Sequence, residues 1–194
     1  MPVVMRVTLR WWMLLTLFAS GCSYTVVEPG HRGLMFDPDR GGLQREVLHP
    51  GRYKLPSGGH VEDFEVIFSK HRETVAVSTS DGGEGILDVS VIYRPIMSEL
   101  YELGTELGRD YYAQVIGPEF QSTARGVFAR HALSSVRARN EPVENEIEAE
   151  LRRRVHGKHV EISSVVIESL KLSPASQARL LLGPVGGPCT PNPL

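Results

Sequence analysis

The segment from Tyr24 to Pro56 constrains the fold most, because turn residues divide it into short apolar inserts. Pro29-Gly30 and Gly41-Gly42 stand at positions where a backbone reverses direction. The apolar residues around them are Val26, Val27, Leu34, Met35 and Phe36. This spacing predicts a β-meander: two short strands around Pro29-Gly30, then a third strand after Gly41-Gly42 that ends at Leu55-Pro56.

Three further runs alternate apolar and polar residues, and they are His60–Phe68, Thr74–Thr79 and Ile86–Arg94. A period of two is typical of half-buried antiparallel strands. Residues 80–85 read Ser-Asp-Gly-Gly-Glu-Gly, which predicts a hairpin loop between the last two strands. The loop could also be read as a calcium or anion site, but it lacks the spaced carboxylates of an EF-hand and the Gly-Lys-Ser of a P-loop, so we favour the hairpin.

The apolar pattern changes to a helical period after Arg94-Pro95, where proline removes a ladder donor and stops the sheet. Apolar spacing predicts one helix over residues 97–107 and a second over residues 112–128. Gly117-Pro118 interrupts the second near its start, so the helix proper begins there. We interpret its apolar stripe as core that packs on the sheet, rather than as a membrane-lying or partner-binding face.

A third helix is predicted from Asn140 to His156, with Asn140 as its N-cap. Val143, Ile147, Leu151 and Val155 form a narrow apolar seam. The acidic residues stand at its front and the basic residues at its end, which suits the helix dipole: Glu141, Glu144, Glu146, Glu148, Glu150, then Arg152, Arg153, Arg154, His156 and Lys158. Two interpretations stay open, a solvated face and an ion-pair surface between subunits.

The last predicted strand runs from Val160 to Leu172. The alternation places Val160, Ile162, Val166, Leu170 and Leu172 on one face, and Val165 and Ile167 on the other. Because both faces carry apolar residues, we expect a central strand, or one that a neighbouring subunit buries. Residues 174–194 are predicted as a short helical turn within Ala175–Leu182, followed by a Gly- and Pro-rich tail.

The N-terminal residues predict export and lipidation. Arg6 and Arg10 precede the apolar run of about nine residues from Trp11 to Ala19, whereas a spanning helix needs roughly 20. Ala19-Ser20-Gly21-Cys22 then resembles a bacterial lipobox. We therefore expect residues 1–21 to be a signal peptide and Cys22 to be the lipidated N-terminus of the mature chain. An uncleaved N-terminal anchor is the alternative.

Charge and cysteine content exclude two other classes of protein. Residues 1–21 hold two of the 21 basic residues and none of the 23 acidic ones, so 19 basic residues remain against 23, a net charge of −4. A nucleic-acid-binding protein would show a basic surplus instead. Cys22 and Cys189 are the only cysteines. With Cys22 lipidated, Cys189 has no partner within the chain, so no disulfide framework is expected.

The sequence shows no convergent set of catalytic groups. It contains neither a Gly-x-Ser-x-Gly elbow nor a Gly-rich dinucleotide loop. His156 and His159 are three apart, but no cysteine pair or His-Glu-x-x-His pattern completes a zinc set. A catalytic set could be imagined with His31 as base, Asp37 as the residue that orients it and Ser23 as nucleophile. However, the spacing of these three residues in the sequence is no more indicative than a random one. We therefore expect a protein that is not an enzyme, without metal or cofactor.

Several motifs in order resemble the Band 7 family, also called SPFH, to which prohibitin, stomatin and flotillin belong. The opening segment resembles the start of a prohibitin domain through Val27, Pro29–Gly33, Met35–Asp37, Arg40-Gly41, Gly51 and Pro56. Later similarities are Leu87–Pro95, Leu103-Gly104 with Tyr111 and Val115, and Glu161–Leu170. The resemblance implies an α+β domain over residues 22–173, in which an antiparallel sheet packs with three to four helices. It also implies a membrane location and self-association into rings or cages, and it carries no catalytic residues.

The chain departs from this family after its last strand, where relatives usually continue into a long coiled coil. Residues 174–194 show no heptads, so any assembly is expected to rest on the domain itself. The predicted function is a membrane-anchored scaffold or regulator of membrane proteins in the bacterial cell envelope, facing the periplasm. Its predicted partners are the membrane, through the lipid anchor, and copies of itself or other membrane proteins. The alternative is a periplasmic lipoprotein that binds a small molecule in a deep apolar pocket between sheet and helices.

Overall fold

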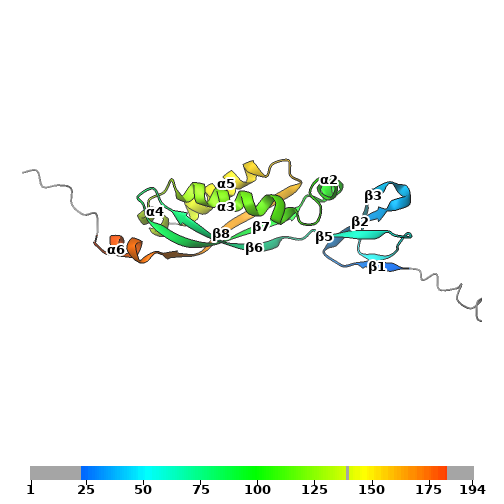
Figure 1. Cartoon of the computed structure of the whole chain (residues 1–194), viewed down its shortest axis with the longest axis horizontal. Helices are drawn as coiled ribbons and strands as arrows, with labels where there is room; N and C mark the ends of the chain where they lie inside the picture. Colours follow the sequence, from blue (N-terminus) through cyan, green and yellow to red (C-terminus); the bar gives the residue numbers. More distant parts are fainter. Residues whose placement is uncertain (1–22, 139, 183–194) are drawn as a thin grey trace, which may run out of the picture.

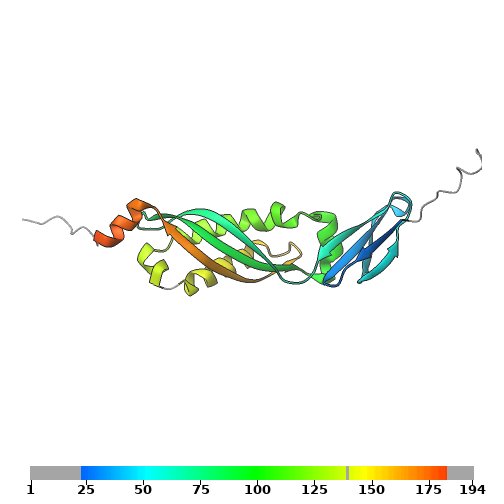
Figure 2. The same ribbon diagram turned by 90° about the horizontal axis from the view of Figure 1, so that it is seen from below.

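The computed structural model describes residues 23–138 and 140–182, which form an elongated molecule (Figure 1). Residues 23–65, hereafter the N-terminal module, hold five strands at one end: β1 (Tyr24–Val27), β2 (His31–Asp37), β3 (Gly42–Leu48), β4 (Gly51–Lys54) and β5 (His60–Glu65). Residues 66–172, hereafter the body, carry the remaining sheet and most of the helices. A helix after the last strand, α6 (Pro174–Leu182), lies at the opposite end of the molecule from the N-terminal module (Figures 1 and 2).

The N-terminal module contains two small antiparallel sheets. Strands β3, β2 and β5 form one in that order, while β1 pairs with β4. Gly30 adopts a φ of 89° in the turn before β2, as the Pro29-Gly30 turn predicted. The single strand predicted to end at Leu55-Pro56 is wrong: the chain breaks at His49-Pro50, and β4 pairs back on β1 instead of continuing β3. Proline has no N–H to donate to a ladder, which accounts for the break.

The sheet of the body consists of β6 (Ser69–Ser78), β7 (Glu84–Pro95) and β8 (Val160–Leu172), in the order β6-β7-β8. The alternation predicted for β7 is confirmed, because Leu87, Val89, Val91 and Tyr93 are all buried. β8 is an edge strand of this sheet, so the predicted central position is wrong, while the alternative, burial by a neighbouring subunit, stays a prediction.

The face assignment predicted for β8 holds for Val160, Ile162 and Leu170, which contact the core, and is wrong for the residues between two register shifts. Val160, Ile162, Val165 and Ile167 are buried together, whereas Val166 is 39% exposed. The register with β7 shifts twice, between the pairs Ile92–Ser164 and Tyr93–Ile162, and between Asp88–Ser169 and Val89–Ile167. Each bulge inserts one residue and reverses which face the following side chains occupy.

The helices of the body cover one face of this sheet, with α3 (Gly117–Phe128) and α5 (Glu141–Arg154) lying across it (Figures 1 and 2). The connection from β7 holds η3 (Met97–Glu99), α2 (Leu100–Glu106) and the π-helical turn η4 (Tyr112–Ile116). Helix α4 (Leu133–Ala138) was not predicted by itself, but α2, α3, α4 and α5 give four α-helices among the described residues of the domain, in agreement with the expected three to four. Helix α6 follows where a short helical turn was predicted. The predicted start of α3 at Gly117 is confirmed. Asn140 precedes α5 but makes no side-chain capping bond.

One apolar core joins the N-terminal module to the body. Leu34 and Phe64 of the module belong to the same buried cluster as Leu100 and Leu103 of α2. A side chain at Gly104 would approach Leu34 Cδ1 to 2.9 Å, so the absence of a side chain on α2 allows the module to seat closely. The result is an α+β fold with antiparallel sheets, as predicted.

Candidate functional site

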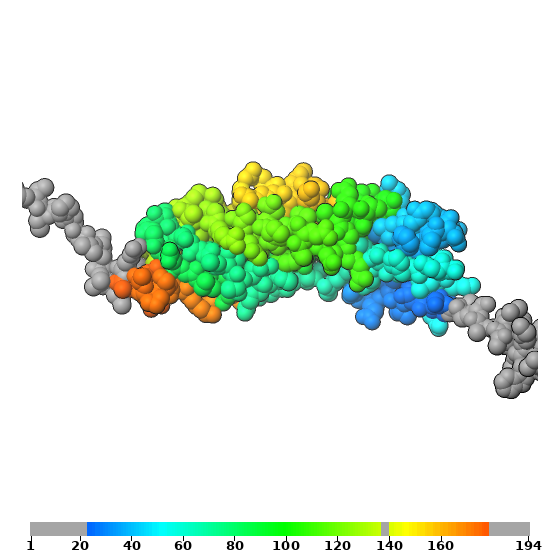
Figure 3. Space-filling model, viewed as in Figure 1, coloured from blue at the N-terminus to red at the C-terminus, as the bar shows by residue number. Residues whose placement is uncertain are grey.

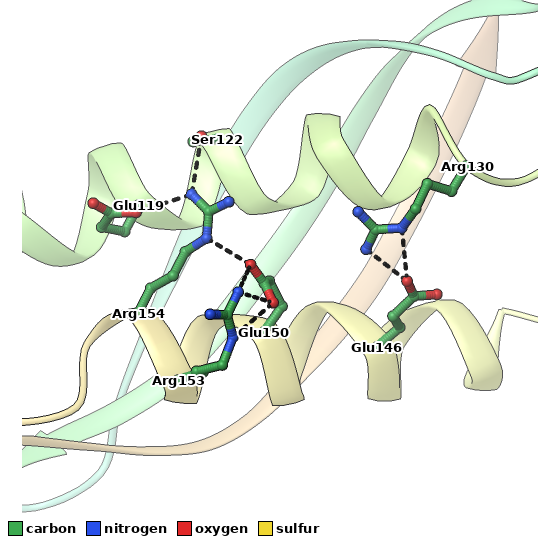
Figure 4. A network of polar contacts seen from close by, with 7 residues as sticks. All are labelled: Glu119, Ser122, Arg130, Glu146, Glu150, Arg153 and Arg154. Atoms are coloured by element: carbon green, nitrogen blue, oxygen red, sulfur yellow. Dashed lines mark hydrogen bonds and ion pairs between the residues drawn. The ribbon is translucent and has the colours of Figure 1, made fainter.

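The charged helix α5 was the predicted surface for assembly, and its charges make contacts within the chain. Arg154 Nε lies 2.9 Å from Glu150 Oε1, and its Nη1 reaches Glu119 Oε2 on α3 at 3.2 Å (Figure 4). Arg153 binds both oxygens of Glu150 at 2.6 and 2.7 Å. The hydrogen bonds from Arg153 and Arg154 lower the pKa of Glu150 to about 2. This network therefore ties α5 to α3 (Figure 4). The two helices also lie against each other on the molecular surface (Figure 3).

A second contact joins the other end of α3 to α5. Arg130 Nη2 lies 2.6 Å from Glu146 Oε1, and His131 Nε2 lies 2.6 Å from Glu146 Oε2. The hydrogen bonds from His131 and then from Arg130 hold the pKa of Glu146 below its usual value. Within α5 itself, Arg152 pairs with Glu148, four residues earlier, at 2.9 Å. These contacts favour an internal role for the α5 charges over the ion-pair surface between subunits.

Two side chains of α5 also close the free edge of β8. Arg152 donates from Nε to the carbonyl of Ile162 at 3.0 Å and from Nη2 to the carbonyl of Ser163 at 2.7 Å. Glu144 Oε1 accepts from the backbone N–H of Ile167 at 2.7 Å. Exposed edge groups are a template for pairing with another strand, and side chains that occupy them hinder such pairing.

The sheet face opposite the helices carries a polar cluster centred on Glu168 of β8. Its Oε1 lies 2.5 Å from Lys70 Nζ and accepts from Ser90 Oγ at 2.9 Å, while Oε2 accepts from Arg72 at 3.0 Å. Hydrogen bonds from Lys70 and Ser90 lower the pKa of Glu168 to about 2. Ser90 is fully buried beneath this cluster. The cluster links all three strands across their uncovered face.

Tyrosines gather where the N-terminal module meets the body. The rings of Tyr93 and Tyr112 stack with centroids 5.2 Å apart, and Tyr111 meets Tyr93 edge-on at 6.1 Å. Tyr112 donates to Glu73 Oε1 at 2.9 Å, and Gln121 donates to Glu73 Oε2. Burial, and for Tyr112 also Glu73, raises the pKa of Tyr111 and Tyr112 well above 10. Hydroxyls with such pKa values stay protonated at neutral pH, which favours a structural role.

The residues considered for catalysis do not come together. His31 Nδ1 lies 2.6 Å from Asp63 Oδ2 in the N-terminal module, so its partner is not Asp37, which instead caps the 3-10 turn η2 (Pro38–Arg40). His31 is the first residue of β2. Ser23 precedes β1, where its carbonyl accepts from Leu55 N at 2.9 Å. The described residues contain no group of three or more metal-ligating side chains.

The described part of the surface carries open grooves, whereas the alternative function predicted a deep apolar pocket between sheet and helices. The first, about 440 Å³, lies in the N-terminal module beside Arg40 and Arg45. The second, about 480 Å³, lies between β5 and Tyr111, and the third, about 420 Å³, lies beside Val155 and Ile162. Charged side chains contribute to the lining of all three. Between the sheet and the helices, large side chains such as Phe120 and Phe128 are fully buried and fill the space.

The outer face of the β1–β4 pair combines apolar and basic side chains. Tyr24 stands opposite Lys54, and Val26 stands opposite Arg52 in the antiparallel register. Tyr24 is 50% exposed and Val26 64% exposed, and Arg52 stacks over the Tyr24 ring at 4.4 Å. Sequence reasoning missed this face because it took β1 to pair with β2. The signal was present as alternation within Tyr24–Val27 and Gly51–Lys54.

Neither the predicted lipidation at Cys22 nor the signal peptide can be placed, because residues 1–22 lie outside the described part of the chain. Among the residues that the structure describes, none of the helices has the length and apolar content needed to cross a bilayer.

Comparison with known proteins supplies the family. The model of the SPFH domain / Band 7 family matches residues 25–180. The chain is 24% identical over 157 residues to "Prohibitin-7, mitochondrial" of Arabidopsis thaliana, which covers 81% of this chain and 56% of the relative. It is 26% identical over 162 residues to "Prohibitin-1, mitochondrial" of the same plant, covering 80% of this chain and 54% of the relative. The chain thus spans about half the length of these relatives.

Proposed function

Since the chain belongs to the SPFH domain / Band 7 family, we propose that it is a membrane-anchored scaffold or regulator of membrane proteins. The anchor is the lipidated Cys22, exposed after removal of residues 1–21. The domain faces the periplasm of a bacterial cell envelope and associates with copies of itself or with other membrane proteins.

The observation that carries this proposal is the family match over residues 25–180, which takes in every described strand except the first residue of β1. Function in such a domain follows from its surfaces rather than from a reaction centre. The residues considered for catalysis lie apart, and the polar clusters on Glu150, Glu168 and Glu73 have their oxygens engaged by partners inside the chain. That arrangement supports a scaffold over an enzyme.

The β1–β4 face supports a membrane position for the N-terminal module. It begins two residues after Cys22, so a lipid anchor there keeps this face within reach of the bilayer. Tyr24 and Val26 can contact the interface, and Arg52 and Lys54 can approach anionic headgroups. Each basic residue near an anionic surface contributes about 1 kcal/mol, a useful supplement to acyl chains at about 0.8 kcal/mol per buried methylene.

Self-association is expected to be weak in solution. The α5 charges are engaged within the chain, and Arg152 and Glu144 occupy part of the β8 edge. Contacts between the remaining exposed charges contribute about 0–1 kcal/mol each and are screened by salt. Anchoring many copies in one bilayer raises their effective concentration, which strengthens weak contacts. The filled core between sheet and helices favours this scaffold role over the small-molecule-binding alternative.

Cross-linking in the native membrane, followed by identification of the linked proteins, tests the proposal. We expect the full chain to be cross-linked to itself or to integral membrane proteins. The Cys22→Ala variant, which keeps the domain but not the anchor, should lose most of these products. A wild-type chain that is recovered only as an uncross-linked soluble monomer would refute the scaffold role.

A further inference from the structure

His159 lies between two carboxylates at the junction of β8 with helix α2. Its Nδ1 lies 2.9 Å from Glu99 Oε2, and its Nε2 lies 3.3 Å from Glu106 Oε2, close enough for an ion pair though not aligned as a hydrogen bond. The side chain of His159 is only 13% exposed. Glu99 belongs to η3 and Glu106 ends α2, so one imidazole joins both ends of the η3–α2 segment to the turn between α5 and β8.

The backbone holds this ring in place at a cost. His159 has a φ of 63°, in the left-handed region, and it is the one non-glycine residue with positive φ in the part of the chain that the structure describes. A non-glycine residue keeps this unfavourable conformation only when the surrounding contacts hold its backbone there. Here the carbonyl of His159 accepts from Ile96 N at 2.9 Å, which ties the turn to the residue just before η3.

Protonation decides whether this contact attracts or repels. A neutral imidazole has one nitrogen that carries a lone pair, whereas both nitrogens of the cation carry protons. Because both nitrogens of His159 face carboxylate oxygens, the neutral form must point a lone pair at one of them. Partial burial favours the neutral form, but the contacts with Glu99 and Glu106 outweigh it, and the pKa of His159 lies above its ordinary value of 6.5.

Two other charged side chains near this junction, Arg152 and Glu161, have partners of their own. The groove beside Glu99 is lined by Arg152 and His156 from α5 and its following turn, and by Glu161 from β8. Arg152 binds the β8 carbonyls and Glu148, and Glu161 lies 2.8 Å from Arg94. Glu99 and Glu106 are thus the carboxylates that His159 contacts directly.

Helix α2 in turn seats the N-terminal module. Gly104 of α2 packs against Leu34, Leu43 and Phe64 of the module. On the exposed side, Arg45 of β3 lies 3.3 Å from Glu102 and stacks over the Tyr101 ring at 4.3 Å. Figure 1 shows α2 at the junction of module and body. A change in how firmly α2 is held therefore acts on the seating of the module.

We propose that His159 is a protonation-dependent clasp that fastens α2 to the α5–β8 turn, so that the seating of the N-terminal module responds to pH. The clasp is closed when the imidazole is charged. Its stabilising contribution is complete at a pH below the ordinary histidine pKa, which the unfolded chain has. The contribution is lost as the pH rises through the higher pKa of His159 in the folded chain. The module is thus held most firmly in weakly acidic surroundings and loosens in weakly alkaline ones.

Hydrogen–deuterium exchange of the full chain in detergent, at about pH 6 and about pH 8.5, tests the clasp. After correction for the pH dependence of intrinsic exchange, residues 97–107 should open several-fold less often at the lower pH. His159→Gln, which cannot be charged, should exchange at both pH values as the wild type does at the higher one. The matched control is His156→Gln on the same turn, where the side chain is exposed, and it should keep the wild-type response.

A second variant separates the effect of protonation from any folding defect that a substitution at residue 159 causes. The double substitution Glu99→Gln and Glu106→Gln keeps His159 but removes both charges that favour its protonation, so the pH response of residues 97–107 should disappear. Exchange in residues 31–48 of the module should follow the same pattern as α2. The clasp is overturned if wild-type α2 opens equally at both pH values, or if the His159→Gln and double variants keep the wild-type pH response.

Discussion

Replacing Gly30 by valine should destabilise the domain through the backbone rather than through a clash. Gly30 has a φ of 89°, and a Cβ added there would lie 3.6 Å from Ile67 Cγ2, an ordinary contact distance. The Gly30 carbonyl accepts from Val66 N at 2.9 Å and the Glu28 carbonyl accepts from His31 N at 3.1 Å, so the turn cannot relax without losing hydrogen bonds. A β-branched residue held at this φ costs about 1–3 kcal/mol.

The matched control lies in helix α3. Gly126 has nothing within 4 Å of an added Cβ, and it stands in a helix interior, so Gly126→Ala should stabilise the chain by about 0.5–1 kcal/mol. The two glycine substitutions should therefore shift stability in opposite directions. His31→Ala, in the same turn, would be a poor control, since His31 contacts Asp63 at 2.6 Å and its removal has a cost of its own.

Urea unfolding followed by circular dichroism measures both changes as shifts in the transition midpoint. We expect Gly30→Val below the wild type and Gly126→Ala above it, with similar slopes. If Gly30→Val unfolds at the wild-type midpoint, the strain assigned to this turn is absent. If both variants fall together, the sign of the glycine argument is wrong.

Four further outcomes are expected. Cys22→Ala should leave the chain full length and release it from the membrane, which mass measurement and fractionation detect. Arg154→Ala should lower the unfolding midpoint more than Arg153→Ala, because Arg154 reaches across to α3 whereas Arg153 binds its own helix. The pKa of Glu168 is lowered from 4.5 to about 2, so its ionised form stabilises the fold at pH values above 4.5, and this stabilisation is lost as the pH falls toward 2. Glu168→Gln should therefore weaken the dependence of the unfolding free energy on pH between those two values. Residues 23–194 should associate weakly on sedimentation, with less association at high salt, and more strongly when anchored on liposomes; a tight oligomer indifferent to salt would point to an apolar interface.

Local periodicity predicted the strands of the body well where the ladder is regular. The buried faces of β6 and β7 follow from alternation alone, since Val75, Val77 and the apolar series of β7 all lie in the core. In β8 the same reasoning failed between the two register shifts, because a bulge is a property of the pair of strands and leaves no mark in one strand's composition. Its apolar residues therefore predicted a central strand where the fold places an edge.

Long-range pairing accounts for the other differences. That β4 returns to β1, and that His31 meets Asp63, depend on contacts between segments more than twenty residues apart. The i to i+4 pairs of α5 were predictable because both partners lie on one helix, whereas the contacts of Arg154 with Glu119 and of Arg152 with β8 were not. The charge pattern of α5 therefore predicted the helix correctly, but it did not indicate which neighbouring elements its charged side chains contact.

The separation of the two described ends gives the molecule a direction. Strand β1 lies at the end formed by the N-terminal module and α6 lies at the opposite end (Figures 1 and 2). The 13 residues of β8 alone extend about 40 Å at roughly 3.3 Å per residue. If Cys22 carries the proposed lipid anchor and the long axis stands upright, the chain would act as a spacer with a narrow footprint on the bilayer and a far end tens of ångströms above it. Copies could crowd side by side without masking that far end, and a partner that contacts α6 would have to project from the membrane by a comparable height.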